Sequence, residues 1–162
     1  MRRSIDAGGF PLFVSHANQI ASQSPNISVN VYLCGLMPFI ITKKFDFEAA
    51  HFIPVFAEGH KCRRMHGHSF KVEVKIKGEI QPEMGILIDF ADVKSVVKPY
   101  IEYLDHDCLN DIAERDSVEL LRNPTSENIC IWLYQQIKPK LPILHSVTVH
   151  ETCTSACEYF VD

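Results

Sequence analysis

The sequence predicts an α+β domain in which one antiparallel sheet carries two helices on one face, in the order β-β-α-α-β-β. Two stretches within residues 39–78 alternate apolar and polar side chains, the period of strands covered on one side only. Two later stretches, within residues 89–139, carry apolar residues at three- and four-residue steps, the period of an amphipathic helix. Alternation returns after residue 144. Strands at both ends with helices between them favour a single sheet.

The first two strands are the clearest elements. In "TKKFDFEAAHF", one face carries Phe45, Phe47, Ala49 and His51. In "HGHSFKVEVKIKG", one face carries His66, His68, Phe70, Val72, Val74 and Ile76, and the other carries Ser69 and charged residues. Gly78 and "QPEMG" then predict a turn.

The two helices are expected in "DFADVKSVVKPYIEYLDH" and "NPTSENICIWLYQQIKPKLP", with a polar connection between them. Asp89 can cap the first helix, and Pro99 predicts a kink or a local break inside it. Thr125 or Ser126 can cap the second helix, and Pro139 ends it. The apolar stripes are Phe90, Val93, Val97, Tyr100, Ile101 and Leu104 in the first, and Ile129, Trp132, Leu133 and Ile137 in the second. "HSVTVHETC" and "CEYFVD" predict the last two strands.

Composition limits the function classes. The chain has 162 residues and a formal net charge of −4, which gives no support to nucleic-acid binding or to a polybasic membrane anchor. No apolar run approaches the roughly 18 residues of a membrane-spanning helix. We expect a cytoplasmic protein with reduced cysteines. Residues 1–36 are expected to form a weakly ordered N-terminal extension, and residues 37–162 the functional domain.

Three histidines stand on strand faces that should be apolar. Side chains at positions i and i+2 of a strand point the same way, so His66 and His68 can aim at one point, and His51 joins them if the two strands pair. Three imidazoles without an obligatory fourth protein ligand are typical of catalytic zinc. The alternative is three separately hydrogen-bonded core histidines. The pattern favours zinc.

Cys62 precedes this pair in "HKCRRMHGHSF" and allows several interpretations. It can be a fourth ligand, which would make the zinc site closed and structural, or it can be a base or a nucleophile. Lys61, Arg63 and Arg64 flank it, and nearby cations favour a thiolate. Asp105 and His106 are candidate partners in a relay, although a "DH" pair at a helix end is more often a solvated cap.

Glu151 repeats the anomaly on the predicted strand that contains Val147 and Val149. A buried carboxylate needs hydrogen-bond donors, and a ligand that presents two adjacent N–H groups would supply them. The alternative is that Glu151 lies beyond the strand end, in water.

Six motifs in register resemble one family. "FEAAH", "HKCRRMHGHSF", "GILIDFADVK", "LDHDCLND", "NPTSEN" and "VHETCTSAC" resemble the 6-carboxytetrahydropterin synthases, the bacterial branch of the 6-pyruvoyltetrahydropterin synthase family. The resemblance covers roughly residues 39–162. The short gap between Cys62 and "HGH" resembles the carboxy-forming branch. The resemblance implies a tunnelling fold (T-fold), assembled as trimers that stack into a homohexamer with active sites between subunits.

The resemblance also implies roles for single residues. His51, His66 and His68 correspond to zinc ligands, Cys62 to the catalytic thiol, and Asp105 with His106 to its relay. Glu151 corresponds to the carboxylate that holds the pterin ring, and we place Thr125 and Ser126 with it as substrate-binding residues. We add Lys61, Arg63 and Arg64 as receivers of a triphosphate, although solvated loop charge explains them equally well.

The implied substrate is 7,8-dihydroneopterin triphosphate. The implied products are 6-carboxy-5,6,7,8-tetrahydropterin, acetaldehyde and triphosphate, a lyase reaction of queuosine biosynthesis. Whether Mg²⁺ accompanies the triphosphate is left open. Two alternatives are formation of 6-pyruvoyltetrahydropterin on the same fold, and a zinc-stabilised pterin-binding module without turnover.

Overall fold

The computed structural model describes residues 38–162, so the predicted extension, residues 1–36, lies outside the described part of the chain. The described residues form a five-stranded sheet in the order β3-β1-β2-β4-β5 with three α-helices, and the predicted α+β class is confirmed. The strands are β1 (Phe39–His51), β2 (His66–Gly78), β3 (Asp107–Cys108), β4 (Leu144–His150) and β5 (Ala156–Phe160). The α-helices are α2 (Phe90–Leu104), α3 (Leu109–Asp116) and α4 (Ser126–Ile137). Two short 3-10 helices are η1 (Lys61–Arg63) and η2 (Glu119–Arg122).

The long β1–β2 ribbon sets the register of the sheet. The two strands are antiparallel, with Phe47 opposite Phe70 and His51 opposite His66. The two phenylalanine rings stack with their centroids 4.9 Å apart. Because side chains alternate between faces, this register puts the apolar positions of both strands on one face and brings the histidines to the same end of it.

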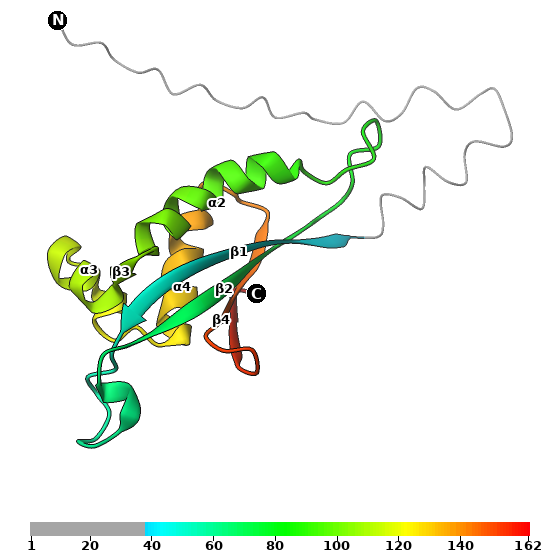
Figure 1. The fold of residues 1–162 in the computed structure, drawn as a ribbon. Coiled ribbons are helices and arrows are strands. Elements are labelled where there is room, and N and C mark those ends of the chain that lie inside the picture. The colour runs from blue at the N-terminus through cyan, green and yellow to red at the C-terminus, as the bar shows by residue number, and fades with distance from the viewer. Residues whose placement is uncertain (1–37) are drawn as a thin grey trace, which may run out of the picture.

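The helices cover that apolar face. Helix α2 packs on β1, and α4 packs on β4 and β5. Figure 1 shows the connection between β1 and β2, which carries Cys62, projecting from one end of the sheet, while the turn after β2 lies at the opposite end. The buried core contains side chains from both helices and three strands, including Val72, Val97, Leu133 and Val149.

The segment between α2 and α4, which we expected to be a polar connection without regular structure, differs from the prediction. It contains β3, α3 and η2. Strand β3 pairs with Ala49 and Ala50 of β1 in parallel, so the sheet is mixed rather than wholly antiparallel. Helix α3 buries Leu109, Ile112 and Ala113, which lie three and four residues apart. A helix this short buries only one turn of apolar side chains, and the surrounding polar residues mask its period.

Of the kink or local break expected at Pro99, the break does not occur, because α2 runs without interruption from Phe90 to Leu104. Proline removes one backbone N–H, which leaves a carbonyl one turn earlier without its helical partner. Pro99 and Ser95, four residues before it, both lie on the exposed side of the helix, where water can satisfy that carbonyl. Asp89 caps the helix as predicted, with its carboxylate accepting from the Ala91 N–H at 2.7 Å. Phe90, expected in the apolar stripe, is exposed.

Helix α4 begins as the sequence predicts. Thr125 is the N-cap, since its hydroxyl accepts from the Asn128 N–H. Ser126, the other candidate cap, instead donates its hydroxyl to Glu151 at 2.8 Å. The predicted stripe, Ile129, Trp132, Leu133 and Ile137, is buried.

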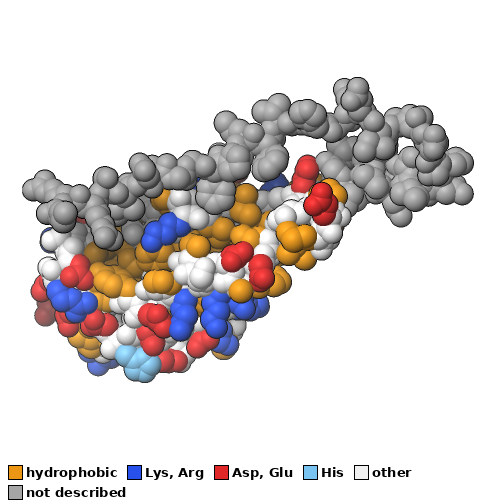
Figure 2. Space-filling view, turned by 90° about the horizontal axis from the view of Figure 1, so that it is seen from above, with side chains coloured by type: hydrophobic (Ala, Val, Ile, Leu, Met, Phe, Trp, Pro, Cys, Tyr) orange, Lys and Arg blue, Asp and Glu red, His pale blue; other side chains and the backbone are white. Residues whose placement is uncertain are grey.

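On the face seen in Figure 2, a band of hydrophobic side chains is bordered by both acidic and basic ones, with several basic side chains lying next to one another. None of the described helices has the length and apolar character needed to cross a membrane.

Within residues 38–162, β1 pairs on its outer edge only at Ala49 and Ala50, and β5 pairs on one side only. The sheet therefore has open edges at both sides.

Candidate metal centre and adjoining cavity

The three predicted imidazoles converge. His51, at the end of β1, and His66 and His68, at the start of β2, have ring centroids between 4.6 and 5.2 Å apart. His51 is only 1% exposed. Gly67, between the two β2 histidines, lies close to β1: a Cβ there would be 3.3 Å from the Ala49 carbonyl oxygen. The small residue therefore allows the tight pairing that brings the rings together.

Backbone carbonyls orient two of these rings. The His51 Nδ1 lies 2.8 Å from the Pro124 carbonyl oxygen, and the His66 Nδ1 lies 2.7 Å from the Arg64 carbonyl oxygen. A carbonyl oxygen only accepts, so each Nδ1 carries the hydrogen and donates it. In the neutral rings each Nε2 then keeps a free lone pair, which is the arrangement found around metal-binding histidines.

Two buried Nε2 atoms of the cluster, those of His51 and His68, are left without hydrogen-bond partners in the described part of the protein. The Glu151 Oε1 lies 3.2 Å from the His68 Nε2, but the two are not aligned for a hydrogen bond. Burial lowers the pKa of both His51 and His68, because removal from water disfavours the charged ring. The neutral form favoured in this way is the form that binds metal.

These atoms can hold a metal ion. One ligand atom from each of His51, His66, His68 and Glu151 can be chosen so that all four lie within 4.8 Å of one another. Imidazole nitrogens with a carboxylate oxygen suit zinc and related transition metals. Cys62, which the sequence allowed as a fourth ligand, is not part of this group in the described chain. The residues present therefore fit a metal, and the closed site with a cysteine ligand is not formed.

Glu151 lies just past the end of β4 and faces the site. Its side chain is 27% exposed, so it is half-buried rather than extended into water. One carboxylate oxygen approaches His68, and the other accepts the hydroxyl of Ser126. Glu151 also lines the adjoining cavity, so it belongs to both parts of the site.

A cavity of about 360 Å³ adjoins the histidine cluster. It lies between the β1–β2 connection, the start of α4 and the β4–β5 turn. The sequence predicted four of its polar residues, namely Cys62, Thr125, Ser126 and Glu151. It did not predict Phe56, His60, Glu127 and Cys157, which also line it.

The backbone around Cys62 is fixed although its side chain is only half-buried. The Cys62 carbonyl accepts from the Ile53 N–H at 2.8 Å, and Ile53 is buried. Asn110 supports the same connection, because its side-chain amide bonds the N–H and the carbonyl of Phe52. Sequence reasoning did not find Asn110, and its only signal was an amide beside the short apolar stripe of α3.

The predicted relay pair lies elsewhere in the chain. The His106 Nδ1 is 2.9 Å from an Asp105 carboxylate oxygen, so the two residues do pair. The backbone N–H of Glu48 also bonds Asp105 and, as the largest cause, lowers the pKa of its carboxyl group. His106 is 77% exposed, and neither residue lines the cavity that contains Cys62. Within one described chain, the pair and the thiol are therefore not brought together.

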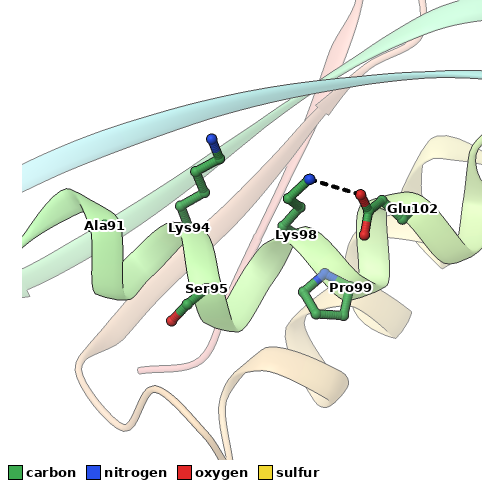
Figure 3. A pocket seen from close by; sticks show the side chains of 6 residues that line it. All are labelled: Ala91, Lys94, Ser95, Lys98, Pro99 and Glu102. Carbon is green, nitrogen blue, oxygen red and sulfur yellow. Dashed lines mark ion pairs between the residues drawn. The ribbon is translucent and has the colours of Figure 1, made fainter.

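The basic residues beside Cys62 do not line this cavity. Lys61, Arg63 and Arg64 are exposed, and the Arg63 Nη1 donates to the Phe56 carbonyl oxygen at 2.7 Å. A different hollow with lysines lies along α2, and Figure 3 shows its wall as Ala91, Lys94, Ser95, Lys98, Pro99 and Glu102. It contains no histidine or cysteine, and Lys98 is paired with Glu102 at 2.9 Å. That hollow does not resemble a reaction site.

Comparison with known proteins agrees with this geometry. A family model described as 6-pyruvoyl tetrahydropterin synthase matches residues 40–161. The chain belongs to the 6-pyruvoyl tetrahydropterin synthase family. The match includes every residue that contributes to the histidine cluster and the cavity.

Within the 6-pyruvoyl tetrahydropterin synthase family, curated relatives carry more specific names. A 6-carboxy-5,6,7,8-tetrahydropterin synthase from Synechocystis sp. is 43% identical over 128 residues, which is 75% of this chain and 93% of the relative. A protein of the same name from Haemophilus influenzae is 33% identical, over 75% of this chain and 98% of the relative. A dihydroneopterin monophosphate aldolase from Pyrococcus furiosus is 35% identical, over 63% and 77%. The predicted resemblance to the carboxy-forming members is confirmed.

A solved structure supports the fold. The 6-pyruvoyl tetrahydropterin synthase of Caenorhabditis elegans superposes with a TM-score of 0.67 at 25% identity, and covers 78% of this chain and 97% of that chain. The predicted tunnelling fold is thereby confirmed.

Proposed function

We propose that this protein is a zinc-dependent enzyme that converts 7,8-dihydroneopterin triphosphate into 6-carboxy-5,6,7,8-tetrahydropterin, with release of acetaldehyde and triphosphate. The observation that carries the proposal is the convergence of three free imidazole nitrogens beside a cavity lined by a thiol that is not a ligand. A structural zinc site is closed, whereas a site with three histidines keeps a position for water or substrate. The 43% identity to a relative named for this product supports the choice of reaction.

Glu151 would orient the substrate. Its carboxylate lines the cavity and is held by Ser126, so it can accept two neighbouring N–H groups of the aminopyrimidinone edge of a pterin. Thr125 and Ser126 stand beside it at the start of α4. A ring fixed in this way presents its side chain to the histidine cluster, which reduces the entropy cost of reaching the reactive geometry.

The metal, held by His51, His66 and His68, would act as a Lewis acid that acidifies the carbon-bound proton next to the side-chain hydroxyls. Cys62 would take that proton as a thiolate. Asp105 and His106 would move protons during elimination and carbon–carbon cleavage. Since this pair does not line the Cys62 cavity of its own chain, we propose that a second copy supplies it, in a trimer or hexamer closed through the open sheet edges.

The remaining parts of the proposal concern the triphosphate and the setting. Lys61, Arg63 and Arg64 are exposed near the cavity, so they are available to a triphosphate that extends out of it, with or without Mg²⁺. The five described cysteines form no disulfide, in keeping with a cytoplasmic enzyme. The product would enter queuosine biosynthesis.

Product analysis tests the proposal. The purified protein is incubated with 7,8-dihydroneopterin triphosphate, the pterin product and acetaldehyde are quantified, and metal content is measured on the same sample. We expect 6-carboxytetrahydropterin and acetaldehyde in equal amounts and about one zinc per chain. A 6-pyruvoyl product without acetaldehyde would show that the protein catalyses the pyruvoyl-forming reaction instead. Binding of the pterin without any product would indicate a zinc-stabilised binding module.

A further inference from the structure

His60 lines the same cavity as Cys62, two residues away, and has no part in the metal centre. It is the N-cap of η1, the short helix that carries Cys62. Its imidazole Nδ1 accepts the backbone N–H of Cys62, with 3.1 Å between the two nitrogens. The Cys62 carbonyl, in turn, accepts the backbone N–H of Ile53, which is buried. Both backbone polar groups of Cys62 are therefore hydrogen-bonded, the N–H to His60 and the carbonyl to Ile53.

The imidazole is itself held in place. The Phe56 ring lies against it, with the ring centroids 4.2 Å apart, and the Phe56 carbonyl accepts from Arg63 at the end of η1. The backbone N–H of His60 donates to the Ala57 carbonyl, with 3.1 Å between the nitrogen and the oxygen. Because Nδ1 accepts a hydrogen bond, the neutral ring carries its hydrogen on Nε2. One nitrogen is therefore committed to the backbone of Cys62.

We propose that His60 is a positioning residue for Cys62: its Nδ1 holds the first turn of η1 and keeps the thiol at the cavity wall. The role rests on the proposed function only in that Cys62 is the reacting base. A single helical turn has no other means within the turn of satisfying its first N–H groups, so its shape depends strongly on the cap. Loss of the cap would let the thiol move relative to the substrate, and displacements of about 1 Å can lower a rate by about 100-fold.

Two variants separate this role from a direct one. In His60→Asn the side-chain oxygen sits on Cγ, as Nδ1 does, and can accept the N–H two residues later. In His60→Gln the polar atoms lie one bond further out, near the place of Nε2, and cannot cap the turn. We expect His60→Asn to keep kcat within about 3-fold of the unmodified protein. We expect His60→Gln and His60→Ala to lower kcat about 10- to 100-fold at unchanged KM and unchanged metal content.

A chemical readout is independent of turnover. The rate of Cys62 alkylation by iodoacetamide is followed by peptide mass spectrometry, with the exposed Cys153 as internal reference. We expect His60→Ala and His60→Gln to change the Cys62 rate by at least about 3-fold while His60→Asn preserves it. Absence of turnover in the unmodified protein would remove the proposed function, whereas the alkylation rates would still report the His60–Cys62 contact.

Three results would overturn the role. Restoration by Gln and not by Asn would mean that Nε2 acts on the substrate. Equal kcat and equal alkylation in all variants would mean that the cap does not position the thiol. Equal losses in Asn, Gln and Ala would mean that the imidazole contributes something other than the capping bond to the Cys62 N–H.

Discussion

At the scale of single residues, the neighbours of the candidate metal-binding histidines determine how their rings are oriented. His51 and His66 donate Nδ1–H to backbone carbonyls, so their other nitrogens are presented to one point. The same histidines, placed on a solvated strand face, would each find water and show no preference for a metal. The arrangement of hydrogen-bond acceptors around the rings is therefore as important as the rings.

Replacement of His51 tests the metal centre. We expect His51→Ala to lose most bound zinc, because only two of the three proposed imidazole ligands then remain. Zinc per chain, measured by mass spectrometry after dialysis, checks this. The matched control is His145→Ala, which removes a histidine that stacks on Phe160 outside the cluster and should leave the zinc content unchanged. Full zinc retention in His51→Ala would contradict the site.

Replacement of Cys62 tests the role of the thiol. We expect Cys62→Ala to lower turnover at least about 100-fold, the usual contribution of a general base, while zinc stays bound. Cys153→Ala, which removes an exposed thiol outside the cavity lining, should be active. Loss of zinc together with the Cys62 thiol would make that sulfur a ligand and end the catalytic assignment.

At the scale of elements, short segments between the main helices hold the site. Asn110 of α3 is 6% exposed, and its amide bonds both backbone groups of Phe52, the residue after His51. It also donates to the Arg122 carbonyl at 3.3 Å. This one side chain thus fixes the point where the chain leaves β1 and enters the connection that carries Cys62.

Asn110→Ala should destabilise the protein. Truncation leaves the partly buried backbone groups of Phe52 without their partner, which costs about 1–3 kcal/mol in the free energy of unfolding. Urea denaturation measures the change. The matched control is Asn128→Ala on the first turn of α4, whose side chain makes one bond, to the Asn123 carbonyl, and should cost less. An equal cost in both variants would contradict a special role for Asn110.

The sheet face opposite the helices carries charge pairs between strands. Glu158 of β5 bonds the Lys75 Nζ at 2.9 Å and the Ser146 hydroxyl at 2.6 Å. The hydrogen bond from Lys75, and next that from Ser146, lowers the pKa of Glu158 below its ordinary value of 4.5. A lowered folded-state pKa contributes stability above about pH 4.5, and this contribution is lost as the pH falls through the folded value.

Glu158→Gln should therefore weaken the fold in a pH-dependent way. At pH 7 we expect a loss of up to about 1 kcal/mol, since the carboxylate is partly exposed and its ion pair is screened. Below pH 4.5 the difference from the unmodified protein should shrink, because both side chains are then neutral. Thermal unfolding between pH 3 and pH 7 checks this, and a difference that grows toward low pH would contradict the pairing.

At the scale of the whole molecule, the separation of Cys62 from the Asp105–His106 pair predicts an assembly with shared sites. Each site would take the thiol from one copy and the relay from the next. Neither Cys62→Ala nor His106→Ala alone should then turn over substrate, but mixed oligomers of the two should form some complete sites. For random mixing of equal amounts, about a quarter of sites would be complete.

Co-expression of the two variants with different affinity tags measures this. In doubly purified oligomers, which contain both variants, we expect activity between about a quarter of the unmodified level (hexamer) and about a third (trimer). If such oligomers are inactive although each variant binds zinc, then either the thiol and the relay of one site come from the same chain, or Asp105 and His106 do not act as a relay. Light scattering on the same samples gives the number of copies.

The sequence by itself determined the main elements and the identity of the histidines. Strands β1, β2 and β4 and helices α2 and α4 each bury a regular stripe, and local periodicity is sufficient to predict such elements. A histidine on an apolar strand face is also visible locally, so His51, His66 and His68 could be named without coordinates. The six motifs were enough to indicate the family.

Only the tertiary structure decided the rest. Helix α3 and strand β3 are too short to carry a period, and the parallel pairing of β3 with β1 joins residues more than fifty positions apart. Whether Pro99 breaks α2 depended on whether the freed carbonyl faces water. The cap that His60 places on Cys62 and the hydrogen bonds of Asn110 to Phe52 join residues through the folded structure. The separation of the thiol from the Asp105–His106 pair likewise follows from the fold. A sequence period records which face a residue occupies, but not what lies opposite it.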